Sequence, residues 1–229
     1  CELGAFCNKD ELADIFAEGK YCIFTKGNRY IYGVGNFFIN LVDDNNKAVL
    51  PLVMLDSNMY GDGGWFYSGF DCIHKDQTEW CMNKLTSLKN EDENIKAMAF
   101  FHMPVREFKE AYEKMKLGDH SVIYEHGSIG EKDEYFGISN RPPHFFEKAV
   151  DNGWLKWIFC GHDHLNTLSL TYKGIRMTYG MSIDYLGYSG IAKQYIQRGA
   201  TLITRKTDGN IDITMVPLTT VVSTRVRGA

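Results

Sequence analysis

The chain has 229 residues, is 44% hydrophobic and carries a formal net charge of −4 at pH 7. This length and apolar content suffice for one domain with a sizeable core, and no linker, repeat or low-complexity segment divides the sequence. The slight acidic excess gives no basic surface for nucleic acid or anionic membranes. No segment approaches the roughly 20 apolar residues of a transmembrane helix. We therefore expect a single domain with neither a nucleic-acid nor a membrane partner.

The first predicted elements are a short helix and a strand pair. Residues 9–18 have helical character and end at a glycine. Residues 30–42 and 48–55 are rich in aromatic and β-branched side chains and are joined by a polar turn, which indicates a hairpin. Pro51 cannot donate a ladder hydrogen bond, so it places the second strand at a sheet edge or beside a bulge.

Helices and strands alternate in the middle of the chain. Residues 76–79, Asp-Gln-Thr-Glu, have the pattern of a capping box that opens a helix. Residues 94–101 read as a core strand, and an apolar stripe over 108–115 predicts a helix ended by a glycine. Residues 118–142 show no period and predict a long ordered loop.

The C-terminal third is rich in predicted strands. A helix is expected to follow Pro142-Pro143, and a buried apolar strand ends at Cys160. Four further short strands are expected at 167–171, 174–179, 200–205 and 211–216. The order of elements therefore predicts a mixed α/β fold.

Histidines follow two of the buried strands directly. Residues 98–101 run into His102, and residues 157–160 run through Gly161 into His162 and His164. In an extended chain the two residues of a His-x-His pair point to the same side. Neutral imidazole is a common transition-metal ligand. An isolated pair of this kind is as often a surface or loop feature, but two strand-end histidine sites favour a shared metal centre.

These segments resemble the motifs of a known superfamily. Phe100–Pro104 and Gly161–Asn166 resemble the calcineurin-like metallophosphoesterases, in the branch related to purple acid phosphatases. Leu55–Ser57, Gln77–Trp80 and Tyr179-Gly180 match the same branch, and the likeness covers most of residues 30–205. The resemblance implies the C-terminal part of a metallophosphoesterase-type sandwich of two mixed β-sheets flanked by helices.

The resemblance also implies a cofactor and a ligand set. In this superfamily two metal ions, often Fe, Mn or Zn, lie between the sheet ends. By resemblance, His102 and His162 hold one ion and His164 holds the other. Asn166 is similar to a residue that follows the last motif, which implies a supporting role beside the ligands.

The first three motifs of the superfamily are absent. These are D-x-H, G-D-x-x-D and G-N-H-D/E, which supply the remaining metal ligands and the histidine beside the leaving group. We therefore expect residues 1–229 to form one C-terminal portion of a domain, with the missing N-terminal half as its partner. The leaving-group acid is expected in that half, so the portion alone should be inactive and poorly soluble.

The implied function is hydrolysis of phosphoesters by a metal-activated water at a dinuclear site. One alternative is a non-catalytic or pseudo-enzyme domain that binds one metal or none. Another is a mononuclear three-histidine hydrolase with an open water position. The specificity loops do not identify the phosphoester substrate.

Several other polar residues have a structural and a functional interpretation. Asp163 should point away from the two ligands and orient an imidazole. Asp56 is either functional or the start of an Asx-turn. His126 and His144 are interpreted as loop hydrogen-bonding residues, and His74 and His120 as surface residues.

Two clusters remain open at this point. Cys72 and Cys81 flank the start of a predicted helix, where a disulfide is possible in principle. The aromatic and glycine-rich segment 60–67 either lines a cleft or packs as a surface loop.

Overall fold

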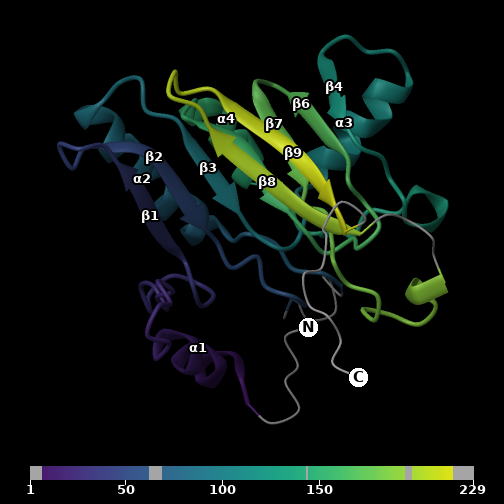
Figure 1. The fold of residues 1–229 in the computed structure, drawn as a ribbon, viewed down its shortest axis with the longest axis horizontal. Helices are drawn as coiled ribbons and strands as arrows, with labels where there is room; N and C mark the ends of the chain where they lie inside the picture. Colours follow the sequence, from purple (N-terminus) through teal and green to yellow (C-terminus); the bar gives the residue numbers. More distant parts are fainter. Residues whose placement is uncertain (1–6, 62–68, 143, 194–197, 219–229) are drawn as a thin grey trace, which may run out of the picture.

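The computed structural model describes residues 7–61, 69–142, 144–193 and 198–218. In these ranges a seven-stranded mixed sheet and a two-stranded hairpin carry the fold, with helices on one side (Figure 1). The strands of the large sheet follow the order β1-β2-β3-β5-β7-β6-β4. Their bounds are β1 Phe37–Val42, β2 Ala48–Met54, β3 Ala97–Phe100, β4 Val122–His126, β5 Leu155–Cys160, β6 Ser169–Tyr172 and β7 Ile175–Tyr179.

The central strands β2, β3, β5 and β7 run parallel to one another. The strand β1 pairs antiparallel with β2, and β6 pairs antiparallel with both β7 and β4. The carboxyl ends of the four parallel strands therefore meet at one edge of the sheet, which we call the carboxyl edge. The helices are α1 Lys9–Ala17, α2 Lys75–Glu91, α3 Arg106–Lys116 and α4 Phe145–Asn152, with 3-10 turns at Lys132–Glu134 and Ile191–Lys193.

Helices α2, α3 and α4 cover one face of the sheet, which we call the helix face. Buried side chains from the helices and the strands form a continuous core there, including Leu85, Phe108, Phe146 and Ile158. The opposite face is crossed by the hairpin of β8 Gly199–Arg205 and β9 Ile211–Pro217 (Figure 1). We call it the hairpin face.

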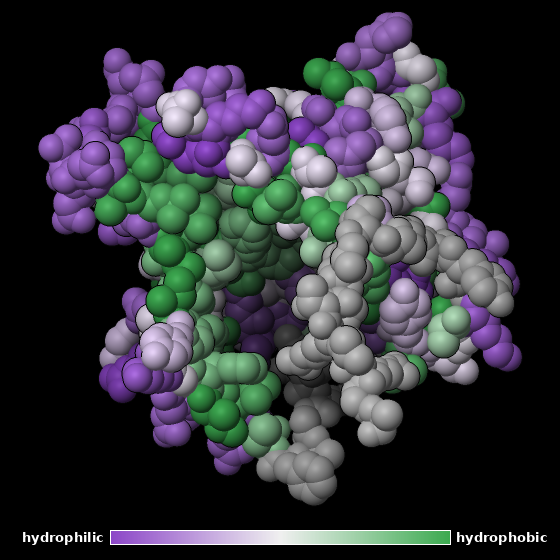
Figure 2. Space-filling model, viewed as in Figure 1, coloured by the Kyte–Doolittle hydropathy of each residue, from purple (hydrophilic) through white to green (hydrophobic). Residues whose placement is uncertain are grey.

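The core under the hairpin is small. Its buried members are Leu50, Met98, Phe159 and Ile213. Apolar residues remain visible over β1 and β2 beside the hairpin, around a hollow (Figure 2). Two layers of sheet with helices outside confirm the α/β fold class, although in the described residues the second sheet is a purely antiparallel hairpin.

Most predicted elements form where the sequence places them. Helix α1 begins at a capping box, because Asn8 Oδ1 accepts the Glu11 amide and the Glu11 carboxylate accepts the Asn8 amide. Gly153 ends α4 in the left-handed conformation, as predicted for a glycine after a helix. Among the helices of the described ranges, none is long and apolar enough to span a membrane.

The first hairpin differs from its prediction at one strand. The strand expected over 30–42 begins only at Phe37, because residues 30–36 form a loop that donates hydrogen bonds to Asp56 and Asp76. Pro51 was expected at a sheet edge or beside a bulge. The strand β2 is not an edge, since it lies between β1 and β3, but its pairing with β1 has a register shift at Leu41/Val42.

The remaining departures concern a loop, a cap and a pair of thiols. The predicted loop 118–142 contains β4, which pairs with β6. Helix α2 begins one residue earlier than the predicted capping box, where Gln77 accepts the amide of His74. Cys72 and Cys81 are both unpaired, so the possible disulfide is not formed.

Candidate metal centre at the carboxyl edge

The strand-end histidines lie side by side because β3 and β5 are parallel neighbours. Phe100 pairs with Phe159, and past the strand ends the Gly161 amide still donates to the His102 carbonyl at 3.0 Å. The His102 and His162 rings lie 5.4 Å apart between centroids, nearly perpendicular to each other. The structure thus brings together two histidines that are 60 residues apart in sequence.

A buried serine fixes the backbone that carries His102. Ser57 follows β2 at the same edge and is 2% exposed. Its Oγ accepts the amides of His102 at 3.1 Å and Met103 at 2.8 Å. Ser57 belongs to the Leu55–Ser57 motif, but this contact was not predicted, because it depends on β2 lying next to β3.

The turn that carries His162 is not extended. His162 has a φ of +68°, in the left-handed region that costs a non-glycine residue roughly 1–3 kcal/mol. The same-side argument for an extended His-x-His pair therefore does not apply, although the histidines do share the edge. The edge of the His162 ring packs against Phe70, with centroids 4.4 Å apart.

Gly137 closes the other side of His162. A Cβ added at Gly137 would overlap His162 Cδ2 and Nε2 and would contact Asp163 Oδ1. The backbone of the 127–137 segment therefore approaches the imidazole as closely as only glycine permits. This neighbour was not predicted, since nothing local in the sequence marks Gly137 as lying beside a motif 25 residues later.

Two of the site histidines, His102 and His162, have pKa values below the ordinary value. Burial, followed by the charges of His102 and His164, lowers the pKa of His162 to about 4. Desolvation and the nearby His164 also lower the pKa of His102, although part of that ring remains exposed. Neutral imidazoles keep a lone pair for a ligand or a proton, as metal binding requires.

The third histidine is held by a carboxylate. His164 Nδ1 lies 2.8 Å from Asp184 Oδ2, in the segment that follows β7. Asp184 was not predicted. It lies 20 residues from its partner, and only the pairing of β7 with β5 brings the two segments together.

The two predicted supporting residues, Asp163 and Asn166, both contact the segment 127–137. Asp163 is 5% exposed and accepts the Gly137 amide and the Tyr179 hydroxyl, the latter at 2.6 Å, rather than orienting an imidazole. Burial raises its pKa to about 6. Asn166 is fully buried, and its Oδ1 accepts the amides of Gly130 and Glu131. Both residues therefore tie the 127–137 segment to the histidine turn.

The remaining candidates have mixed outcomes. Asp56 accepts the Asn58 amide at 3.0 Å, which is the Asx-turn, and also contacts Lys9 at 2.5 Å. His74 is not a plain surface residue, because its ring stacks on Tyr32 and bonds the buried Asp71. Within the described residues, His126 has no hydrogen-bond partner for either ring nitrogen, contrary to its interpretation as a loop hydrogen-bonding residue.

Two further predicted features lie away from the histidines or outside the described residues. His144 is exposed and precedes α4 without a side-chain capping bond, and His120 is exposed in a turn, as predicted. Most of the aromatic and glycine-rich segment 60–67 lies outside the residues that the structure describes.

The histidines fit part of a metal site. Two neutral imidazoles with rings 5.4 Å apart can share one ion. In the described parts of the chain, however, no group of three or more His, Cys, Asp or Glu side chains has the arrangement of a metal site. Zinc sites in proteins use three or four protein ligands, so for zinc further donors would have to come from outside this set.

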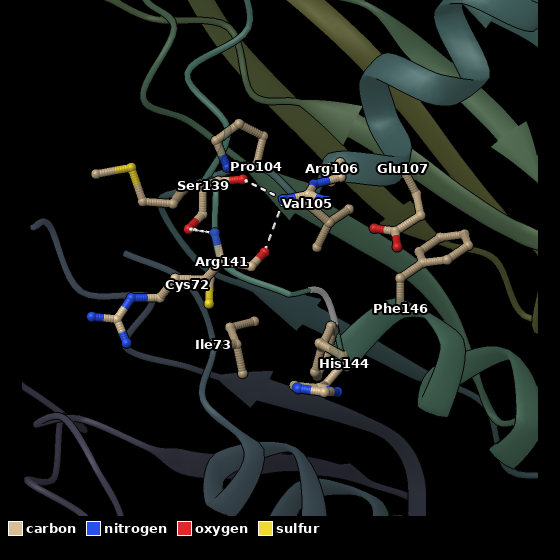
Figure 3. A pocket seen from close by; sticks show the side chains of 12 residues that line it. Cys72, Ile73, Pro104, Val105, Arg106, Glu107, Ser139, Arg141, His144 and Phe146 are labelled. Atoms are coloured by element: carbon tan, nitrogen blue, oxygen red, sulfur yellow. Dashed lines mark hydrogen bonds between the residues drawn. The ribbon is translucent and has the colours of Figure 1, made fainter. Parts of the chain in front are cut away.

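A small cavity of about 30 Å³ lies behind the site, between the starts of α3 and α4 (Figure 3). The Glu107 carboxylate lies beside Phe146 at this cavity, and its Oε2 has no hydrogen-bond partner (Figure 3). Glu107 is 5% exposed, and burial raises its pKa above the usual value. The charge of Arg106 offsets this effect only in part, and its guanidinium donates to the carbonyls of Ser139 and Arg141.

Several curated proteins named as phosphatases are similar in sequence to this chain. The chain is 29% identical over 172 residues to a protein of Arabidopsis thaliana named probable inactive purple acid phosphatase 29, covering 69% of this chain and 41% of the relative. It is 28% identical over 149 residues to phosphatase DCR2 of Saccharomyces cerevisiae, covering 61% and 23%. No family model matches the chain.

A third relative, probable inactive purple acid phosphatase 28 of Arabidopsis thaliana, is 25% identical over 181 residues, with 72% of this chain and 40% of the relative covered. These matches confirm the resemblance to the purple-acid-phosphatase branch of the calcineurin-like superfamily. The chain spans less than half the length of these curated relatives. The family is that of phosphatases, and catalysis by this chain is a separate question.

Proposed function

We propose that this chain is the C-terminal portion of a metal-dependent phosphoesterase that hydrolyses phosphoesters with a metal-activated water at a dinuclear site. In this proposal residues 1–229 are one portion of a domain, and a missing N-terminal half completes the ligand set. Fe, Mn and Zn are the candidate ions, because each of them binds imidazole together with carboxylate ligands.

The observation that carries the proposal is the meeting of His102 and His162 at the carboxyl edge. Their parent strands are adjacent and parallel, and the rings lie 5.4 Å apart. The His162 backbone is held in a costly left-handed conformation, a feature that clusters at functional sites. Packing alone would not require either the strained turn or a pair of neutral imidazoles at a strand end.

The residues present define which steps this chain would perform. Bound metal ions would lower the pKa of a coordinated water and neutralise charge that develops on the phosphoryl group. His102 and His162 would donate Nδ1 or Nε2 lone pairs to one ion, and His164 to the other. Phe70 and Gly137 restrict the motion of His162 from two sides. A leaving-group acid is not assigned in this chain.

Metal content and turnover test the proposal together. We would measure bound Fe, Mn and Zn, and hydrolysis of p-nitrophenyl phosphate, for residues 1–229 alone and joined to the N-terminal half of the domain. The expected result is two metals and turnover in the joined protein, with weak or partial metal binding in residues 1–229. His162→Ala should abolish turnover and lower the metal content, whereas His120→Ala, in an exposed turn, should leave both unchanged.

A non-catalytic domain is the second candidate. It is supported by the lack of a group of three or more metal-binding side chains in the described residues, and by relatives whose names mark them as probable inactive. This candidate predicts one bound metal or none and no turnover in the joined protein. Metal-dependent turnover by the wild-type joined protein, lost in the His102→Ala variant, would eliminate the non-catalytic candidate.

A further inference from the structure

The segment after β7 presents one carboxylate to the candidate metal centre. Asp184 Oδ2 lies 2.8 Å from His164 Nδ1, and Asp184 Oδ1 accepts the Leu186 amide at 2.8 Å. The two carboxylate oxygens are therefore used separately, one for the imidazole and one for the local turn. This division fixes the orientation of the carboxylate relative to the ring.

The backbone around Asp184 is anchored on a buried arginine. Arg198 is 1% exposed, and its Nε donates to the Asp184 carbonyl at 2.7 Å. The Asp184 amide donates to Ser182 Oγ, and the Gly199 amide donates to the Ser182 carbonyl. The carboxylate is thus held in place by the start of β8 and does not depend on its imidazole partner for its position.

Gly187 leaves space for this contact and for nothing larger. A Cβ at Gly187 would overlap Asp184 Oδ2 together with His164 Cε1, and would press on Nδ1. The chain therefore passes across the carboxylate–imidazole pair at a distance that only glycine permits. Three independent features therefore fix the position of the His164 ring: the two separately bonded oxygens of Asp184, the Arg198 contact to the Asp184 backbone, and the close approach of Gly187.

From this geometry we infer that Asp184 is a positioning residue that fixes His164 in the tautomer with its proton on Nδ1 and its lone pair on Nε2. An ionised carboxylate can only accept hydrogen bonds, so Nδ1 must carry the proton that is shared with it. In the described residues no hydrogen bond to His164 Nε2 is found, so Nε2 is the nitrogen left for a ligand. Such outer partners orient metal-binding histidines and raise their basicity.

The inference rests on the proposed function only for the identity of that ligand, since the tautomer is a property of the chain by itself. We would record long-range ¹H–¹⁵N spectra of histidine-labelled protein at pH 7.5, without metal, for wild type and variants. The expected wild-type spectrum has a protonated Nδ1 and an unprotonated Nε2 for His164. Asp184→Ala should shift His164 toward the Nε2-protonated form, and Asp184→Asn, whose amide oxygen still accepts, should restore much of the Nδ1-protonated form.

A matched control separates positioning from general damage. Asp208 accepts the amide of Asn210 two residues later, as Asp184 does with Leu186, but it contacts no imidazole. Asp208→Ala should leave the His164 spectrum unchanged, and thermal melts would verify that each variant is folded. A wild-type His164 protonated on Nε2, or an Asp184→Ala spectrum identical to wild type, would overturn the inference.

A titration with Zn²⁺ distinguishes this inference from the proposed function. If His164 binds metal, Asp184→Ala should weaken affinity by about 10- to 100-fold, and Asp208→Ala should not change it. If wild type binds no metal while the tautomer behaves as expected, the metallophosphoesterase proposal fails and the role of Asp184 stands. If metal binds and the His164 tautomer is the same in wild type and Asp184→Ala, the positioning role of Asp184 is wrong and the metal site stands.

Discussion

The two faces of the seven-stranded sheet are covered in different ways. On the helix face, side chains from three helices and the strands form one continuous apolar core. On the hairpin face, a cluster with four buried members lies under β8 and β9, beside apolar surface that stays visible over β1 and β2 (Figure 2). The histidine edge lies between a rigid, closed layer and a partly open one.

This difference indicates which layer contributes most to the stability of the fold. Burial of apolar surface is the dominant stabilising term in folding, so the helix face should hold the fold together. The open part of the hairpin face is where the proposed N-terminal half would add its side of the sandwich. Each face also holds one poorly satisfied ionisable group, Glu107 on the helix face and His126 on the hairpin face, which gives separate probes of the two layers.

The largest expected effect is on the helix face. Phe108 is fully buried and packs on Tyr179 and Phe136, so Phe108→Ala should cost about 3–5 kcal/mol of unfolding free energy. Ile213 is 8% exposed in the small cluster, and Ile213→Ala should cost about 2 kcal/mol, the low end of its range. Urea unfolding at pH 7 measures both. Equal losses would mean that the two layers are packed alike.

Glu107 tests the helix face in the opposite direction. It is a buried acid with an unpartnered oxygen, so Glu107→Met should stabilise the fold by about 1–3 kcal/mol at pH 7. Burial raises the folded-state pKa of Glu107 above its ordinary 4.5. The part of the unfolding free energy that depends on Glu107 is therefore fully present below pH 4.5, and it is lost as the pH rises through the folded-state pKa.

The advantage of Glu107→Met should consequently be larger at pH 7 than at pH 4, as read from urea midpoints at both values. Glu113→Met serves as the control, because Glu113 is exposed on the same helix and should change stability by less than about 0.5 kcal/mol. A pH-independent gain would show that the effect comes from packing and not from the charge.

His126 gives the corresponding test of the hairpin face, with a smaller effect. It pairs with Ser169 at the end of β4 and lacks partners for both ring nitrogens, so His126→Leu should stabilise by about 1 kcal/mol. Burial, and then the charge of Arg176, lowers the pKa of His126 below 6.5. The contribution of neutral His126 to the unfolding free energy is therefore present above pH 6.5, and it is lost as the pH falls through the folded-state pKa.

The gap between His126→Leu and wild type should thus widen toward acid pH, whereas the Glu107→Met gap should narrow. Thermal melts between pH 4 and pH 8 would show both trends, with His120→Leu as the exposed-histidine control. Parallel trends for the two variants would contradict the assignment of one acidic and one basic group to the two faces.

The sequence predicted this fold where local signals agreed with tertiary pairing. The helix expected over residues 9–18 and the helix expected after Pro142-Pro143 rest on local features, and both formed as expected. The strand predicted over residues 30–36 failed because side chains of Asp56 and Asp76, far along the chain, hold that segment as a loop. Aromatic and β-branched composition cannot reveal such partners.

The candidate site shows the same division. His102 and His162 were identifiable because each follows an apolar strand directly, and strand-end placement is visible in sequence. Asp184 and Gly137 were not identifiable, because each reaches the site from a loop whose path depends on which strands pair. The predicted grouping of His162 with His164 rested on an extended geometry that the left-handed turn at His162 does not have.

The smallest expected change in stability concerns the exposed edge strand β1 of the seven-stranded sheet. In the described sheet β1 is an edge strand, and Val42 is 48% exposed near its end. An exposed apolar edge invites pairing with another chain, so residues 1–229 should self-associate, and Val42→Lys should reduce this association. The unfolding free energy should change by less than about 0.5 kcal/mol, since Val42 buries little surface.

Sedimentation velocity across a concentration series measures the association. Leu117→Lys is the matched control, because Leu117 is 88% exposed beyond α3, away from this edge, and the same change in charge there should not alter association. Equal effects of the two substitutions would attribute solubility to net charge, and the edge of β1 would then no longer be the open side of the fold.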